Sequence, residues 1–282
     1  MKRQSSFNNK QATLYLVATP IGNLSEMTPR AIEILKEVDI IAAEDTRQTG
    51  KLLAYFSIET RMIAHHKFNE MASSQGIVDL LNQGKNVALV SDAGYPLISD
   101  PGNILVSMVV QAGYNVVPIS GAHAGINALV ASGLNTTQYV FVGFLNQKFS
   151  IRQRQLERYL LYPETLVIYE APHRVKKTLQ HIYDVFGNRQ MCLAREITKL
   201  HEEFMRGNIS EVLAEIDEIK GEIVLVIAGH LQEEYLLVMD DIRSLVEEEM
   251  AQGLTKSEAI RKISKELKIS KNQIYQELHE IC

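Results

Sequence analysis

The sequence has no tryptophan, only two cysteines among its 282 residues, and no apolar run that approaches the length of a membrane-spanning helix. Cys192 lies in an apolar segment and Cys282 is the last residue, so neither a disulfide framework nor a cysteine metal cluster is available. The longest apolar runs, such as residues 223–228, fall far short of the roughly 20 residues that cross a bilayer, and residues 1–10 are polar. We therefore expect a soluble, cytoplasmic protein with no signal peptide and no membrane association.

Several cofactor-binding and hydrolytic patterns are also missing. No G-x-G-x-x-G follows the first predicted strand and no G-x-x-x-x-G-K-[ST] occurs, so neither a dinucleotide Rossmann site nor a P-loop is supported. His65 and His66 are not followed by a third ligand at metal spacing, and no metal is expected. Ser91, Ser120 and His173 lack the G-x-S-x-G turn that would favour a hydrolytic triad.

The net charge of the chain limits how much of its surface can bind nucleic acid. The net charge of −5 argues against wholesale coating of nucleic acid but leaves room for a local basic patch. Residues 255–271 hold six basic side chains against two acidic ones, an excess of four that is typical of a modest nucleic-acid footprint. Arg152, Arg154 and Arg158 share one predicted helical segment, where they either contact phosphates or form an ordinary solvated face.

The first half of the chain alternates apolar runs with amphipathic helical patterns. The length and the 46% hydrophobic content allow a large core, and we expect it to divide between domains. Thr28 is placed to cap a helix whose first position is Pro29, where the missing N–H is not needed. The alternation predicts a parallel α/β sheet. Its predicted strands are 14–18, 40–43, 87–90 and 116–119, and its predicted helices include 32–38 and 104–112.

A second series of alternating elements predicts a second α/β unit, joined to the first by a helix within residues 121–133. Its predicted strands are 139–145, 165–169, 190–194 and 222–228, and its predicted helices lie near 152–161, 174–185 and 209–217. The predicted domains are thus a flexible extension over 1–12, α/β domains over 13–120 and 121–232, and a helical domain over 233–282.

The C-terminal segment has a strongly helical composition beyond Gly229. Two S/T-x-x-E/Q capping boxes, Thr255 with Glu258 and Ser270 with Gln273, predict two helix starts. One apolar face is predicted for the helix before them, and it consists of Ile242, Leu245, Val246 and Met250. We expect a small three-helix domain that resembles a helix-turn-helix.

Small and charged residues gather where predicted strands end. The segment 91–102 carries two carboxylates and two glycines directly after the strand 87–90, which is where open α/β sheets bind ligands. Charged residues also follow the next strands, at 170–174 and 195–203. The alternatives are a tight βα connection and solvated loops with surface ion pairs. The repetition at successive strand ends favours a cleft.

Seven short blocks, in a fixed order between about residues 13 and 229, together resemble the bacterial ribosomal RNA small subunit methyltransferase I family. Each block is unremarkable alone, but the ordered set is highly specific. The blocks are VATPIGNL (17–24), AEDTR (43–47), SDAGYP (91–96), SDPG (99–102), PISG (118–121), EAPHR (170–174) and REITK (195–199). The C-terminal segment resembles that family's helical domain less specifically.

The resemblance implies a tetrapyrrole-methylase-type fold, in which S-adenosylmethionine lies in a cleft between two α/β domains, usually in a homodimer. It also implies 2′-O-methylation of cytidine 1402 in 16S rRNA of the small ribosomal subunit. Carried over residue by residue, the implied cofactor contacts are Pro20, Asp92, Ala93, Gly94, Tyr95, Ser120, Gly121, His123 and Ala124.

Methyl transfer to a ribose is an in-line displacement, so it needs the hydroxyl held close to the methyl group and a base for the hydroxyl proton. Our candidates for the base are the strand-end carboxylates Asp100 and Glu170, followed by Glu196. The candidate RNA-phosphate contacts are Arg174, Arg195, Lys199, Lys262 and Lys265.

Two other functions remain open from the sequence. The same fold permits methylation of a tetrapyrrole, although the charged blocks at 170–174 and 195–199 and the basic C-terminal segment favour RNA. A protein of a different class, a metabolite sensor that grips DNA through its terminal helices, would not need charged residues along a cleft.

Overall fold

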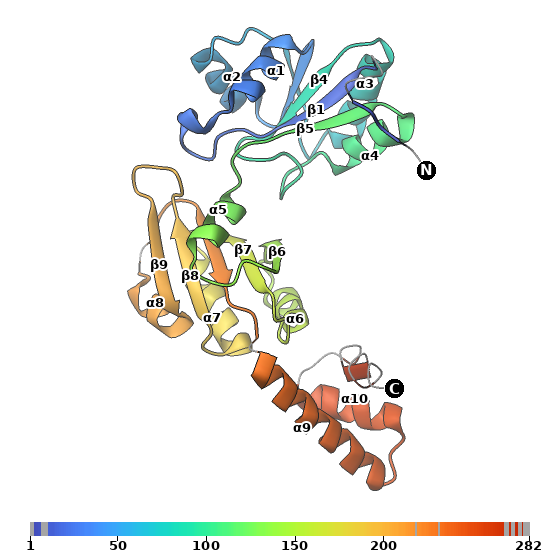
Figure 1. Ribbon diagram of the computed structural model, residues 1–282, viewed down its shortest axis with the longest axis vertical. Helices are drawn as coiled ribbons and strands as arrows, with labels where there is room; N and C mark the ends of the chain where they lie inside the picture. Colours follow the sequence, from blue (N-terminus) through green and yellow to red (C-terminus); the bar gives the residue numbers. More distant parts are fainter. Residues whose placement is uncertain are drawn as a thin grey trace. The chain divides into compact units, whose positions relative to one another are not determined.

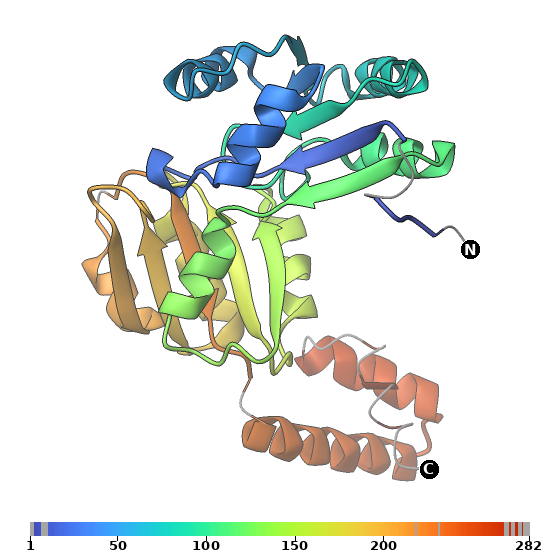
Figure 2. The same cartoon turned by 45° about the horizontal axis from the view of Figure 1, so that its top comes forward.

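A computed structural model describes residues 3–6, 11–217, 219–230, 232–267, 271, 274, 275 and 278, with the backbone alone over 232–241. The chain divides into two compact units (Figures 1 and 2). Unit 1 contains residues 1–127 and 197–201, and unit 2 contains residues 128–196 and 202–282. The domain boundaries predicted at 120 and 232 stay predictions. No described helix is both long and apolar enough to cross a membrane.

Unit 1 is built on a five-stranded sheet, and every pairing in this sheet is parallel, as the sequence predicts. The order across the sheet is β3-β2-β4-β1-β5. The strands are β1 (Thr13–Val17), β2 (Ile40–Ala43), β3 (Met62–Ala64), β4 (Val87–Val90) and β5 (Asn115–Ile119). Strand β4 is buried along its whole length, which explains why its sequence is continuously apolar and not alternating.

Helices cover both faces of this sheet (Figure 1). One core lies under α1 (Pro29–Glu37) and α2 (Thr46–Tyr55), and the other lies under α3 (Glu70–Asn82) and α4 (Asn103–Ala112). The start of α1 confirms the sequence prediction, because the Thr28 hydroxyl accepts a hydrogen bond from the Ala31 N–H at 3.2 Å and Pro29 follows it. A fifth helix, α5 (Ala124–Ala131), lies within the predicted 121–133 segment.

Unit 2 contains a mixed five-stranded sheet in the order β6-β7-β10-β8-β9. The strands are β6 (Tyr139–Phe144), β7 (Thr165–Glu170), β8 (Gln190–Arg195), β9 (Glu203–Asn208) and β10 (Ile223–Ile227). Only β6 and β7 run parallel, and the other three pairs are antiparallel. The core is formed with α6 (Phe149–Arg158), α7 (Val175–Phe186) and α8 (Ile209–Glu215).

The C-terminal segment of unit 2 contains α9 (Gln232–Ala251) and α10 (Lys256–Leu267). The capping box at Thr255 is confirmed, since its N–H and hydroxyl both donate to Glu258, at 3.0 and 2.6 Å. The second predicted box, Ser270 with Gln273, lies outside the described residues. Part of the predicted apolar face of α9 is wrong. Ile242 and Val246 are buried in a cluster with Leu161 and α10, whereas Leu245 and Met250 are exposed.

Candidate functional site

Four loops of unit 1 meet at the carboxyl edge of the parallel sheet, because β1, β2, β4 and β5 all end there. The loops are 18–28, 44–45, 91–102 and 120–123, and three of them contain eight of the nine predicted cofactor contacts; the ninth, Ala124, begins α5. This edge is where doubly wound sheets bind their ligands.

The loops after β1 and β4 are joined by an isolated antiparallel bridge between Thr19 and Gly94. The two backbones exchange N–H···O hydrogen bonds of 2.9 and 3.0 Å, and the Thr19 hydroxyl donates to the Ser91 carbonyl at 3.2 Å. Gly94 has a φ of 77°, in the left-handed region that glycine adopts without a steric cost. Thr19, Ser91 and Gly94 are all buried, so this bridge holds the exposed Asp92 and Ala93 in place.

The loop after β5 is held against the same bridge by Tyr95. Its hydroxyl accepts a hydrogen bond from the Gly121 N–H at 3.1 Å. A Cβ at Gly121 would come within 2.7 Å of the Ala18 Cβ, so only glycine permits this approach to the end of β1. His123 accepts a hydrogen bond from the Ile126 N–H at 3.1 Å, and burial lowers the pKa of this imidazole. His123 is thus kept neutral where α5 starts.

Three carboxylates, Glu44, Asp92 and Asp100, form an acidic group at this edge. Burial raises the pKa of Asp100 to about 6; Glu44 and then Asp92 add to the rise, and a hydrogen bond with Ser91 opposes it. Burial also raises the pKa of Glu44, with Asp92 as the next cause. Asp92 is exposed as a residue, but partial burial of its carboxyl group raises the pKa of that carboxyl as well. A carboxylate with a pKa of about 6 is mostly ionised at neutral pH and still basic enough to accept a proton in a reaction.

The loop from β4 to α4 has an unusual backbone around these acids. Leu97 and Ser99 adopt positive φ angles of 73° and 71°, which non-glycine residues seldom do. The Gly102 N–H donates to the Glu70 carboxylate at 2.8 Å, at the start of α3. This loop is therefore held in a strained conformation beside Asp100, an arrangement that is found most often at functional sites.

Residues 197–201 leave the second sheet and belong to unit 1. The side chain of Lys199 lies directly against Gly22 in the loop after β1, where any Cβ would collide with it. Glu196 and Thr198 on either side of Ile197 have φ angles of 49° and 72°. The Glu196 carboxylate accepts a hydrogen bond from the Glu222 N–H at 2.9 Å, so this candidate base also fixes the loop before β10.

In unit 2, the carboxylate of Glu170 is buried and holds its own loop. One oxygen accepts from the Ala171 N–H at 2.7 Å, and the other forms an ion pair with Arg174 at 3.1 Å. Arg174 also donates to the Leu145 carbonyl at 3.0 Å. Arg195 forms an ion pair with Glu203 at 3.0 Å. These predicted base and phosphate-contact residues therefore have protein partners.

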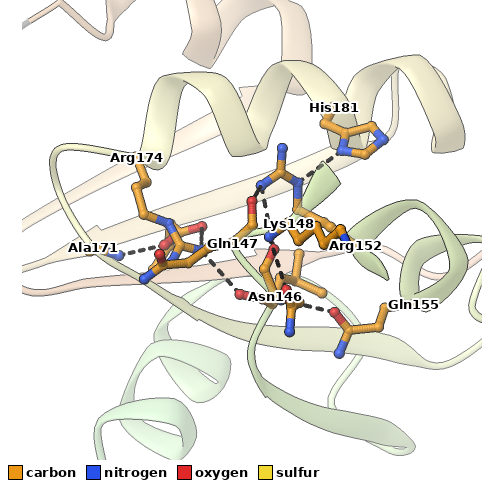
Figure 3. A network of polar contacts seen from close by, with 10 residues as sticks. Asn146, Gln147, Lys148, Arg152, Gln155, Ala171, Arg174 and His181 are labelled. Carbon is orange, nitrogen blue, oxygen red and sulfur yellow. Dashed lines mark hydrogen bonds and ion pairs between the residues drawn. The ribbon is translucent and has the colours of Figure 1, made fainter. Parts of the chain in front are cut away.

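The prediction that Arg152 faces phosphate or solvent is wrong. Its guanidinium is buried between α6 and α7, where it donates to the His181 ring at 2.9 Å and to the carbonyls of Asn146 and Gln147 (Figure 3). Arg154, two residues further along α6 and therefore on the opposite side of the helix, is exposed as predicted for a solvated face. The periodic spacing of the arginines did not distinguish a buried guanidinium from a solvated one.

The remaining predicted residues differ in their position, hydrogen bonds and exposure. Pro20 adjoins the Thr19 bridge, Ser120 accepts the Thr28 hydroxyl at 3.3 Å through its carbonyl, and Ala124 begins α5. On α10, Lys262 donates to both carboxylate oxygens of Glu249 at 2.7 Å, while Lys265 is exposed. The expected cleft between two domains stays a prediction.

Sequence reasoning missed Thr19, Ser91 and Glu44 as site residues. A signal for Glu44 was present, because it follows the strand 40–43 directly, as Ser91 follows 87–90. The roles of Thr19 and Ser91 depend on hydrogen bonds between loops that are more than 70 residues apart, which no local pattern reports.

Comparisons with known proteins agree with this architecture. A family model of tetrapyrrole (corrin/porphyrin) methylases matches residues 13–213. The chain is 45% identical to ribosomal RNA small subunit methyltransferase I of Streptococcus pyogenes over 100% of both chains. It is 44% identical to the Bacillus subtilis protein of that name over 99% of both, and 48% identical to the Synechocystis one over 93% of this chain and 96% of the other.

Two solved structures share the fold at low sequence identity. Uroporphyrin-III-C-methyltransferase from Thermus thermophilus has a TM-score of 0.55 at 17% identity, covering 77% of this chain and 94% of that one. Diphthine synthase has a TM-score of 0.59 at 13% identity, covering 80% and 93%. The mixed α/β architecture with a parallel sheet is thus a tetrapyrrole-methylase-type fold, as the sequence predicts.

Proposed function

This chain belongs to the ribosomal RNA small subunit methyltransferase I family of tetrapyrrole methylases, and from that premise we propose that it methylates the 2′ oxygen of cytidine 1402 in 16S rRNA, with S-adenosylmethionine as methyl donor. The observation that carries the proposal is the identity of 44–45% to proteins of that name over 99–100% of both chains. Five of the seven sequence blocks also lie where strands of the first sheet end. A cytoplasmic homodimer that needs no metal is part of the same proposal.

The residues at the carboxyl edge of unit 1 fit this donor by their chemistry. The nine predicted contacts include no lysine or arginine, and His123 is kept neutral, so the set suits a positively charged sulfonium and not a phosphate. Asp92 adds a negative charge, and Gly94 and Gly121 present backbone without side chains. S-adenosylmethionine supplies, when bound, a methyl group on a positively charged sulfur.

Asp100 is the carboxylate that we assign as the base. It stands on the same edge as the predicted donor contacts, and its raised pKa would let it take the proton of the ribose hydroxyl while that oxygen bonds to the methyl carbon and the bond from this carbon to the donor sulfur breaks. Glu170 and Glu196 are weaker candidates, because their carboxylate oxygens already accept hydrogen bonds from the Ala171 and Glu222 N–H groups, and Glu170 also pairs with Arg174.

The cationic side chains would hold the RNA by its phosphates. Lys199 lies against the loop after β1, next to the predicted donor contacts, and Lys265 projects from α10. Arg174, Arg195 and Lys262 each have a carboxylate partner, so an RNA phosphate would compete with an existing ion pair at these three side chains.

The test is transfer of labelled methyl groups from S-adenosylmethionine to four acceptors: assembled small subunits that lack the modification, naked 16S rRNA, DNA, and a precorrin mixture. We expect label in the RNA of small subunits, at a higher rate than in naked RNA, because a net acidic enzyme with a modest basic patch reads shape more than charge. Equal rates on a short free oligonucleotide would contradict that preference. Label in the precorrins alone would favour the tetrapyrrole function, and binding of DNA without transfer would favour a sensor.

A further inference from the structure

The turn between β3 and α3 presents an aromatic ring to solvent from a rigid backbone. Asn69 closes the turn: its side-chain oxygen accepts from the His66 N–H at 2.8 Å, its side-chain N–H donates to the Ala64 carbonyl at 3.1 Å, and its own N–H donates to the His66 carbonyl at 3.0 Å. His65 is buried and its ring contacts the Ser73 hydroxyl at 2.8 Å. The two residues between these anchors, Lys67 and Phe68, form the tip.

Phe68 at this tip is 96% exposed, more than any other large hydrophobic residue in the described part of the chain. Its ring makes an edge contact with His66, with the centroids 6.2 Å apart, and Lys67 beside it is also exposed. Met71, 64% exposed, is the one large apolar side chain exposed nearby on α3. The surface is therefore too small and too polar for a stable protein interface, which buries about 800 Å² on each partner.

The turn emerges at the edge of the sheet where the candidate site lies. Strand β3 pairs in parallel with β2, so Ala64 lies opposite Ala43, and the residues that follow them leave the sheet on the same side. His66 is near enough to Glu44 to oppose the rise that burial and Asp92 cause in the pKa of that carboxyl. The exposed ring thus belongs to the surroundings of the acidic group in unit 1.

We propose that Phe68 is a platform on which an unpaired base of the RNA substrate stacks, while Lys67 contacts a phosphate next to that base. The inference rests on the proposed function, which makes RNA the acceptor. Single-stranded RNA is commonly recognised by bases stacked on aromatic side chains beside cationic ones. Because hydrogen bonds already fix the turn, little conformational entropy is lost when the base binds.

The absence of tryptophan makes the test direct, since F68W would contain the only tryptophan of the chain. We expect its fluorescence to be quenched when small subunits that lack the methyl group are added. The matched control is Y55W, at another exposed aromatic of unit 1 on α2, where we expect no quenching. Equal signals in both variants, or none in either, would overturn the proposal.

Kinetics separate this inference from the proposed function. We expect F68A to raise the KM for small subunits about tenfold, as the loss of one stacked base would, while kcat and the affinity for S-adenosylmethionine stay unchanged and F68Y restores the KM. If the wild-type chain methylates RNA and F68A has the same KM, this inference fails and the proposed function stands. A changed oligomeric state of F68A, seen by sedimentation, would instead assign the ring to contact with a second copy and contradict RNA stacking.

Discussion

At the scale of single residues, Gly94 is needed for its positive φ angle and not for lack of space around it. It exchanges two hydrogen bonds with Thr19 at a φ of 77°, and a Cβ there would meet Ile21 at an ordinary 3.4 Å. Gly84 has almost the same φ, 79°, with nothing within 4 Å of a Cβ, and lies in the turn between α3 and β4. Alanine substitutions at Gly94 and Gly84 therefore cause similar backbone strain, and only the substitution at Gly94 lies in the candidate site.

We predict that G94A and G84A each destabilise the protein by about 1–2 kcal/mol, because alanine is strained in the left-handed region. Only G94A should weaken S-adenosylmethionine binding, since the strain there displaces the bridge between the loops after β1 and β4. Chemical denaturation measures the stability and calorimetry measures the affinity. Equal donor affinities in the two variants would show that the bridge has no part in binding.

Asp100 is placed where its charge is unfavourable for folding. Its pKa is raised to about 6 from an unfolded value near 3.8, so the ionised form destabilises the folded state above pH 6 and the effect disappears as the pH falls towards 4. We predict that D100N stabilises the protein at pH 7.5 by about 1 kcal/mol, after allowance for partial exposure, and not at pH 4. Thermal unfolding at the two pH values measures this difference.

The same substitution should abolish most of the activity, because the base is lost. We expect the single-turnover rate to fall about 10²–10⁴-fold in D100N, while the wild-type rate rises as the pH passes through about 6. The control is E44Q, which removes the negative charge that helps to raise the pKa of Asp100. The increase in rate should then occur at lower pH, and the maximal rate at high pH should be unchanged. A wild-type rate that does not change between pH 5 and 7 would exclude Asp100 as the base.

At the scale of elements, the sequence predicted the strands of both sheets well where they are continuously apolar and buried. Strands β2 and β4 agree with the prediction to the residue. Helices α2 and α3 and strands β3 and β9 were not predicted. Strand β3 has three residues, none buried, and β9 is an edge strand with glutamate at its start, so neither has an apolar run to recognise.

Helices α6 and α7 are joined by a buried polar contact in addition to their apolar core. Arg152 donates to the His181 Nδ1, so the other ring nitrogen carries the proton and contacts Gln153. We predict that R152K destabilises the protein by about 2–4 kcal/mol, because lysine cannot reproduce the fork of donors inside the core. Urea denaturation measures the loss, and R154K on the exposed side should stay within about 0.5 kcal/mol. A similar small change in R152K would contradict this account of the contact.

At the scale of the whole molecule, the family and fold could be predicted from ordered blocks, since each block is a local sequence. The partners of the site residues could not, because they depend on contacts such as Thr19 with Gly94 and Lys199 with Gly22 that join distant segments. The C-terminal charges illustrate the same limit. Lys262 counted as a free cation in the sequence, yet it pairs with Glu249 across α9 and α10. The excess of positive charge open to RNA is therefore smaller than the composition indicates.

The position of the transferred methyl group decides whether this chain is a cytidine 2′-O-methyltransferase. Small subunits that lack the modification would be incubated with the enzyme and labelled S-adenosylmethionine, their 16S rRNA digested to fragments and nucleosides, and the label located by mass spectrometry. We predict one methyl group per subunit, on the ribose 2′ oxygen of cytidine 1402. A methyl group on a base, at another nucleotide, or on no RNA at all would contradict it.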